Sequence, residues 1–151
     1  MDDSRAQRFV VVVFDGVSLG IMSFAFGVFD MALHYGVLPD LQVRIVSGEP
    51  AAQINGGGLA CAVPYDLDAI AEADLIIIPN WRDPAEPPPA PLLETLRKAH
   101  ARGTRVAGLC SGAFVLAAAG LLDERPATTH WALAGLLAQM YPKVEVRPGQ
   151  L

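Results

Sequence analysis

The sequence has little cysteine, little charge and no long apolar run. Its two cysteines, Cys61 and Cys110, are too few for a disulfide framework and too far apart for a cysteine-based zinc motif. The 11 lysine and arginine residues are scattered, and Arg97–Lys98 is the longest basic run. Because phosphate binding needs clustered cations, a chain with a net charge of −5 is a poor nucleic-acid surface.

The run from Phe9 to Phe14 contains only valine and phenylalanine, but it is too short to cross a membrane or to form the core of a signal peptide. We therefore expect a cytoplasmic protein without a membrane partner, in which both thiols stay reduced. We also expect neither a metal nor an organic cofactor.

Apolar residues, by contrast, make up 52% of the chain, which is enough for the core of one domain. Strands alternate with helices along the chain, which predicts a doubly wound α/β fold with a mostly parallel sheet covered by helices. Strands are predicted at residues 9–14, 41–46, 74–79 and 104–109, with a hairpin at 53–61. Helices are predicted at residues 18–35, 64–73, 92–101, 113–122 and 129–141.

The predicted helix 18–35 and the end of the chain each have a further feature. In the predicted helix 18–35, apolar residues recur at helical spacing, namely Ile21, Phe24, Ala25, Val28, Phe29, Ala32 and Leu33. A further strand is predicted to start at Val144, close to the end of the chain. Because an α/β layer normally closes with a covering helix, we expect residues 1–151 to be the front part of a longer fold.

Three polar or reactive positions directly follow predicted strands: Asp15, Asn80–Trp81 and Cys110. Open α/β sheets bind ligands at the carboxyl ends of their strands, so these residues should gather at one edge. Trp81 stands beside a loop, residues 83–91, that carries five prolines. Its side chain is expected either to line a pocket or to hold that loop in place.

The segment Gly108-x-Cys110-x-Gly112 matches a nucleophile elbow with cysteine in place of serine. Glycine is needed on both sides because the strand turns sharply into a helix, whose N-terminus favours a thiolate and offers N–H groups to an oxyanion. The alternative is a structural cysteine at a tight turn. His130 is the best candidate base, and a purely structural histidine is again the alternative. Cys61 is expected to be a packed, small apolar residue.

The segments Gly108–Ala117 and Ala127–Trp131 together resemble the PfpI-type, class I glutamine amidotransferase-like domain, and more narrowly its copy in the N-terminal half of many AraC-type transcriptional regulators. Further matching segments are Phe14–Ser18, Gly57–Ala60, Ala73–Pro79 and Trp81–Pro84. The resemblance implies a flavodoxin-like α/β fold, a homodimer, an elbow cysteine at Cys110 and a histidine at His130. It also implies an acidic residue about five positions after Gly16, where this chain has Ile21.

The missing carboxylate favours a domain without turnover. The first hypothesis is therefore that residues 1–151 form the sensor or dimerisation domain of an AraC-type regulator, incomplete at its C-terminus, with DNA bound by a helix-turn-helix domain outside this chain. A small-molecule effector would then contact residues at the strand ends: Asp15, Gly16, Trp81, Cys110, Ser111 and His130. The second hypothesis is a hydratase or hydrolase in which Cys110 attacks a small electrophile and His130 moves the proton.

Overall fold

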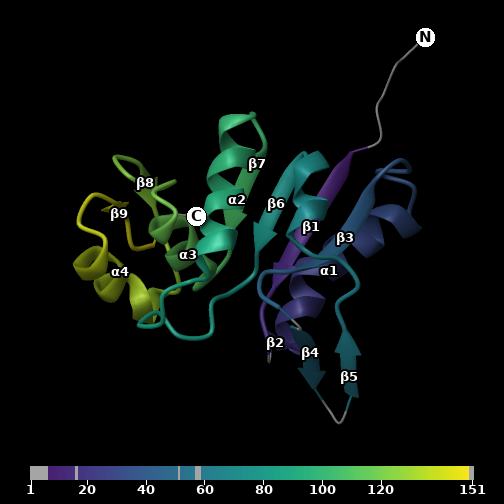
Figure 1. The fold of residues 1–151 in the computed structure, drawn as a ribbon, viewed down its shortest axis with the longest axis horizontal. Coiled ribbons are helices and arrows are strands. Elements are labelled where there is room, and N and C mark those ends of the chain that lie inside the picture. Colours follow the sequence, from purple (N-terminus) through teal and green to yellow (C-terminus); the bar gives the residue numbers. More distant parts are fainter. Residues whose placement is uncertain (1–6, 16, 51, 57–58, 150–151) are drawn as a thin grey trace.

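The computed structural model describes residues 7–15, 17–50, 52–56 and 59–149, and its centre is a four-stranded parallel sheet (Figure 1). The strand order is β3 (Gln42–Ser47), β1 (Arg8–Val13), β6 (Leu75–Ile78) and β7 (Arg105–Gly108). Phe9 pairs with Val43 on one side and with Leu75 on the other, which places β1 inside the sheet. The predicted doubly wound α/β class, with a mostly parallel sheet, is therefore confirmed.

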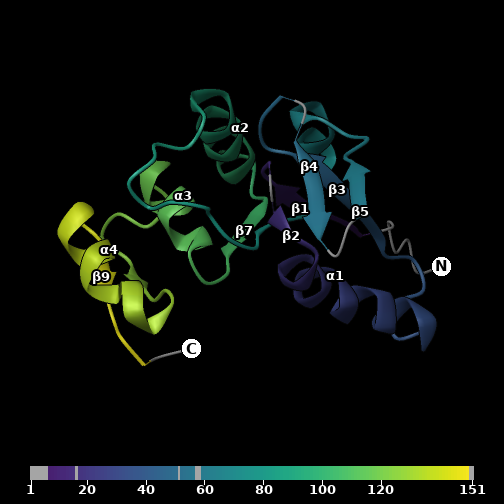
Figure 2. The same cartoon turned by 90° about the horizontal axis from the view of Figure 1, so that it is seen from below.

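Valine side chains of β1 alternate between two apolar cores, one on each face of the sheet. Val10 and Val12 pack with the helices α2 (Ala90–Ala101) and α3 (Gly112–Ala118), whereas Val11 and Val13 pack with α1 (Leu19–His34). Figure 2 shows α1 on one side of the strands and α2 and α3 on the other. A strand buried on both faces must be apolar throughout, which is why the uninterrupted run of valines predicted it correctly.

Two small sheets flank the central one. The strands β2 (Val17–Ser18), β4 (Gln53–Gly56) and β5 (Leu59–Ala62) form the first, in which β4 and β5 are the predicted hairpin. The strands β8 (Pro126–Ala127) and β9 (Glu145–Val146) form the second and pair in parallel. The predicted strand at Val144 therefore exists, but it pairs with β8 beyond the edge of the central sheet (Figure 1).

Three predicted helices are shorter than expected. The segment before β6 forms only the 3-10 helix η1 (Leu67–Glu72), and α3 ends at Ala118 because Gly120, with φ 75°, terminates it. The predicted helix 129–141 is divided into η2 (Trp131–Leu133) and α4 (Ala134–Met140). No helix in the part of the chain that the structure describes is long and apolar enough to span a bilayer.

The helix α1 has the predicted apolar spacing but buries only part of its apolar surface. Met22 and Ala25 are in the core beside β1. A second row at the same spacing points to solvent and is 58–83% exposed; it consists of Phe24, Val28 and Met31 on α1 and Tyr35 directly after it, and we refer to it as the α1 stripe. Periodicity alone identifies an apolar helix face, whereas the packing determines whether that face is covered.

Candidate functional site

The carboxyl ends of the parallel strands bring together the residues that were predicted to gather there. Asp15 follows β1, Trp81 follows β6 and Cys110 follows β7. The segment after β3 joins them, because the backbone N–H of Asp15 donates to Glu49 Oε1 at 2.7 Å. Gly16 lies outside the described residues.

Cys110 occupies a sharp turn from β7 into α3 and has a φ of 51°, which a residue with a side chain rarely adopts. A Cβ added to Gly108 would lie 2.9 Å from the backbone of Gly112, and one added to Gly112 would overlap the carbonyl oxygen of Ile78. Both glycines are therefore required sterically, and we refer to the turn from Gly108 to Gly112 as the elbow. The side chain of Cys110 is exposed, but α3 has only seven residues, so its dipole is weaker than the predicted longer helix would supply.

Ser111 holds the elbow against the segment after β6. Its hydroxyl accepts the backbone N–H of Trp81 at 2.9 Å and donates to the carbonyl of Trp81 at the same distance. The residue is buried, with 8% of its surface exposed. The predicted effector contact by Ser111 stays a prediction, but in this structure its hydroxyl already donates its hydrogen and accepts one N–H within the protein.

Trp81 anchors the proline-rich loop. Its indole N–H donates to the carbonyl of Glu86 at 2.9 Å, and its ring meets the ring of Phe14 edge to face at 4.5 Å between centroids. Only 2% of the residue is exposed. Of the two predicted roles for Trp81, the structure supports holding the loop, and contact with a ligand stays a prediction.

A contact that the sequence did not predict ties the loop before His130 to the elbow. Thr129 Oγ1 donates to the carbonyl of Cys110 at 2.8 Å. His130 itself is exposed, and its Nδ1 accepts the backbone N–H of Ala132 at 3.3 Å. Within the described residues, no hydrogen bond joins the thiol of Cys110 to His130. The two residues are thus on segments joined by the Thr129 bond, and their pairing as nucleophile and base stays a prediction.

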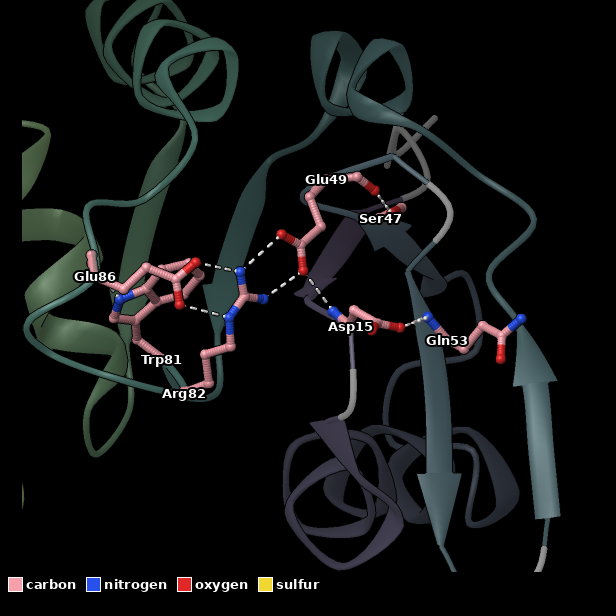
Figure 3. A network of polar contacts seen from close by, with 7 residues as sticks. All are labelled: Asp15, Ser47, Glu49, Gln53, Trp81, Arg82 and Glu86. Atoms are coloured by element: carbon pink, nitrogen blue, oxygen red, sulfur yellow. Dashed lines mark hydrogen bonds and ion pairs between the residues drawn. The ribbon is translucent and has the colours of Figure 1, made fainter.

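Figure 3 shows a charged network on the same edge, centred on Arg82. The guanidinium donates to both oxygens of Glu49 and to both oxygens of Glu86, and it lies 4.8 Å above the ring of Trp81. Glu49 also accepts from the backbone of Asp15, and Asp15 Oδ1 accepts the backbone N–H of Gln53 at 3.2 Å. These bonds join the segments after β1, β3 and β6.

Within the described part of the chain, the carboxylates near the elbow are engaged in this network and not with Cys110. Ile21, where the family resemblance implied an acid, lies in the first turn of α1. Asp15 and Glu49 are at the strand ends but are engaged with Arg82 and the backbone, and no contact joins either side chain to Cys110 among the described residues. Glu49 was not predicted from the sequence, because its partner Arg82 is 33 residues away and no local pattern links the two.

The other cysteine differs from its prediction. Cys61 was expected to be packed, but it is exposed on β5. The hairpin of β4 and β5 belongs to a small separate sheet, and β5 is the edge strand of that sheet, so its side chains are less covered than those of the central strands. Both thiols are therefore open to reagents in solution.

Acid should weaken the Arg82 network. The hydrogen bonds from Arg82 lower the pKa of Glu49 and of Glu86. Groups whose pKa is lower in the folded state stabilise it above their ordinary pKa, and that contribution is lost as the pH falls through the folded value. We expect Arg82→Met to lower the melting temperature at pH 7, and the difference from the unmodified protein to shrink below about pH 4.

The pair Lys98–Glu94 supplies the control for that measurement. It is also an ion pair that lowers a glutamate pKa, but both side chains are more than 60% exposed on α2. Exposed pairs contribute little to stability, so Lys98→Met should leave the melting temperature nearly unchanged at every pH. A constant difference between Arg82→Met and the unmodified protein from pH 7 to pH 3.5 would contradict the prediction; these pH values are roughly the range in which carboxylates titrate.

Comparisons with known proteins find relatives of this chain in sequence and in fold. The model of the DJ-1/PfpI family matches residues 8–147. An uncharacterised protein from the cpoL 5′ region of Streptomyces lividans is 40% identical over 139 residues, which are 90% of this chain and 96% of that protein. The HTH-type transcriptional regulator GlxA of Rhizobium meliloti is 51% identical over 53 residues, 35% of this chain and 16% of the regulator.

Two further similarities concern an enzyme and a solved structure. Isonitrile hydratase of Pseudomonas putida is 32% identical over 106 residues, which cover 66% of this chain and 44% of the enzyme. An AraC family transcriptional regulator from Pseudomonas putida has the same fold, with a TM-score of 0.76 at 22% identity over 95% of this chain and 77% of that chain. The chain thus spans less than half of the named regulator and of the hydratase that it matches in sequence.

Proposed function

This chain belongs to the DJ-1/PfpI family, and from that premise we propose that it is the effector-sensing and dimerisation domain of an AraC-type transcriptional regulator, working in the cytoplasm without catalytic turnover. Its relatives include HTH-type regulators. With a net charge of −5 and scattered basic residues, the domain itself is poorly suited to DNA, so DNA binding is assigned to another domain of the regulator.

The observation that carries the dimerisation role is the α1 stripe. Four large apolar side chains with 58–83% exposure are unusual along one helix and the residue that follows it in a monomer, because contiguous apolar patches usually mark an interface. Side chains of this size cover on the order of 400–600 Å², a large part of the roughly 800 Å² that each partner buries in a standard interface.

Charge supports a second copy of the same chain as the proposed partner that covers the stripe. Two molecules of net charge −5 repel each other unless they meet where carboxylates are scarce. Asp30 is the only acidic residue of α1, and the helix has no lysine or arginine. A symmetric pair of α1 stripes would bury apolar surface without bringing many like charges together.

Charged substitutions in the stripe should abolish the dimer. We expect the unmodified chain to be a dimer at micromolar concentration, and the double variant Phe24→Asp/Val28→Asp to be a folded monomer, because four carboxylates would then face one another across the interface. Size-exclusion chromatography with light scattering measures the mass, and circular dichroism checks the fold.

Trp131 provides a matched control for the dimer. It is as exposed as Phe24, at 83%, but it lies in η2. Trp131→Asp should therefore remain a dimer. A monomeric unmodified chain, or a stripe variant that stays dimeric, would refute the proposed dimer interface.

The effector is proposed to enter at the strand ends, with Asp15, Gly16, Trp81, Cys110, Ser111 and His130 as the candidate contacts. Among the described members of this set, Asp15, Cys110 and His130 are exposed and so are open to a ligand directly. Ser111 and Trp81 are buried and support the turn on which Cys110 stands.

A cysteine-dependent enzyme is the alternative, favoured by the exposed Cys110 at a strained turn and by the similarity to isonitrile hydratase. Cys110 would attack the electrophile and His130 would move the proton. The test uses a Cys61→Ser background, in which Cys110 is the remaining thiol. Alkylation of the native protein at neutral pH that is many times faster than that of the same chain unfolded in urea would support the enzyme, and an equal or slower rate would support a domain without turnover.

A further inference from the structure

A pocket of about 420 Å³ is lined by Glu49 but not by its partner Arg82, and it shares no wall residue with the elbow. Its size is within the range of small-molecule sites. The wall comes from the segment after β3, from the residues before and within η1, and from the start of α2. The residues that line it are Ser47, Gly48, Glu49, Pro50, Ala52, Val63, Pro64, Tyr65, Asp66, Leu67, Asp68, Pro89 and Pro91.

The pocket wall is mostly apolar, and the charged side chains that line it are all acidic. Four prolines, Val63, Leu67 and the ring of Tyr65 supply hydrocarbon surface, and three carboxylates supply all the charge: Glu49, Asp66 and Asp68. In the described part of this wall there is no lysine, arginine or histidine. Arg44 lies 5.3 Å from the centre of the Tyr65 ring but does not line the pocket.

The start of α2 does not turn the pocket into an anion site. Helix N-termini bind anions through their free N–H groups. Here Pro89 is the N-cap and Pro91 is in the first turn, and neither residue has an N–H group to donate. Both residues line the pocket instead.

The three carboxylates are not equally available to a ligand. Glu49 is already paired with Arg82. Asp66 uses Oδ1 to accept the backbone N–H of Asp68 at 3.0 Å, which caps η1, and it retains its charge. Among the described residues the carboxylate of Asp68 has no hydrogen-bond or ion-pair partner. Uncompensated negative charge therefore remains at Asp66 and Asp68, beside the apolar wall.

We propose that this pocket binds a small organic cation with an apolar body, such as an alkylammonium or cycloalkylammonium ion. The ammonium group would lie against Asp66 and Asp68, and the hydrocarbon would pack on the proline rings and Leu67. This site is separate from the effector contacts proposed at the elbow, and its occupancy can be measured whether or not the chain is a regulator.

Three probes of one shape test the charge requirement: cyclohexylammonium, cyclohexanol and cyclohexanecarboxylate. We expect amide chemical shifts of residues 47–50 and 63–68 to move on titration with cyclohexylammonium. Its affinity should exceed that of cyclohexanol by about tenfold, as two partly screened carboxylates would supply, and should fall with added salt. Cyclohexanecarboxylate should not bind.

A double variant removes the charge without removing the cap. Asparagine caps a helix about as well as aspartate, so Asp66→Asn keeps the start of η1, and Asp68→Asn breaks no side-chain hydrogen bond or ion pair to the described residues. The variant Asp66→Asn/Asp68→Asn should bind cyclohexylammonium about tenfold more weakly. Asp30→Asn/Asp40→Asn changes the net charge equally outside the pocket and should bind normally.

Either of two results would overturn the proposal. One is equal affinity for cyclohexanol and cyclohexylammonium, or for the double variant and the unmodified chain. The other is that the shifted amides lie at residues 108–112 and 128–131, which would place the ligand at the elbow. Dimer mass, measured separately, tests the proposed function and does not depend on this titration.

Discussion

Replacing Gly112 by alanine should cost the protein about 3 kcal/mol of unfolding free energy or more, although the change adds a single methyl group. The added Cβ would overlap the backbone carbonyl oxygen of Ile78, at the end of β6. A side chain could rotate away, but a carbonyl held in the central sheet cannot move without displacing the strand. Urea unfolding followed by circular dichroism gives the difference in free energy.

Gly135 is the matched control for this substitution. It is a glycine near the start of α4, as Gly112 is of α3, and a Cβ added there meets no atom within 4 Å. Gly135→Ala should be neutral or stabilise by up to about 1 kcal/mol, because alanine favours a helix over glycine. If Gly112→Ala lost less than about 1 kcal/mol, the turn would be more adaptable than this packing implies.

Replacing Ser111 by alanine should cost about 2–4 kcal/mol, because it leaves two buried backbone groups of Trp81 without partners. The N–H and the carbonyl of Trp81 each lose a 2.9 Å hydrogen bond, and the missing hydroxyl leaves little room for water. Chemical unfolding measures the loss. Limited proteolysis of the proline-rich loop should also accelerate, since Trp81 holds that loop through Glu86.

Ser23 is the control for the loss of a hydroxyl. Its Oγ donates to the carbonyl of Gly20 on the exposed side of α1, so Ser23→Ala should change stability by no more than about 0.5 kcal/mol. Stability and effector response, measured together on Ser111→Ala, separate the two roles of Ser111. Unchanged stability with loss of effector response would favour the predicted ligand contact over the support of Trp81.

Local patterns predicted most of the fold. The valines of β1 could only form a strand covered on both faces, and the glycines at 108 and 112 are required wherever a strand turns so abruptly into a helix. Because parallel strands end at one edge, the positions of Asp15, Trp81 and Cys110 relative to those strands also followed from the sequence. Each of these features depends on residues that are close together in the chain.

The features that the sequence did not predict depend on partners far apart in the chain. Arg82 pairs with Glu49, and Ser111 forms hydrogen bonds with Trp81, which lies 30 residues earlier. No pattern in one segment predicts its partner in the other. Whether a side chain is buried also depends on segments that are distant in the chain. Cys61 is exposed because its hairpin lies in a separate small sheet, and the α1 stripe is exposed because β1 covers only one face of a helix that is apolar on two.

The sequence by itself therefore determined the α/β class, the sharp turn at Cys110 and the edge of the sheet where chemistry or recognition would occur. Only the tertiary structure decided that Ser111 and Trp81 point inward, that Glu49 is engaged with Arg82, and that the α1 stripe is left uncovered. The physical reason is that periodicity and steric limits act between neighbouring residues, whereas hydrogen-bond partners and burial are set by whichever distant segment packs against them.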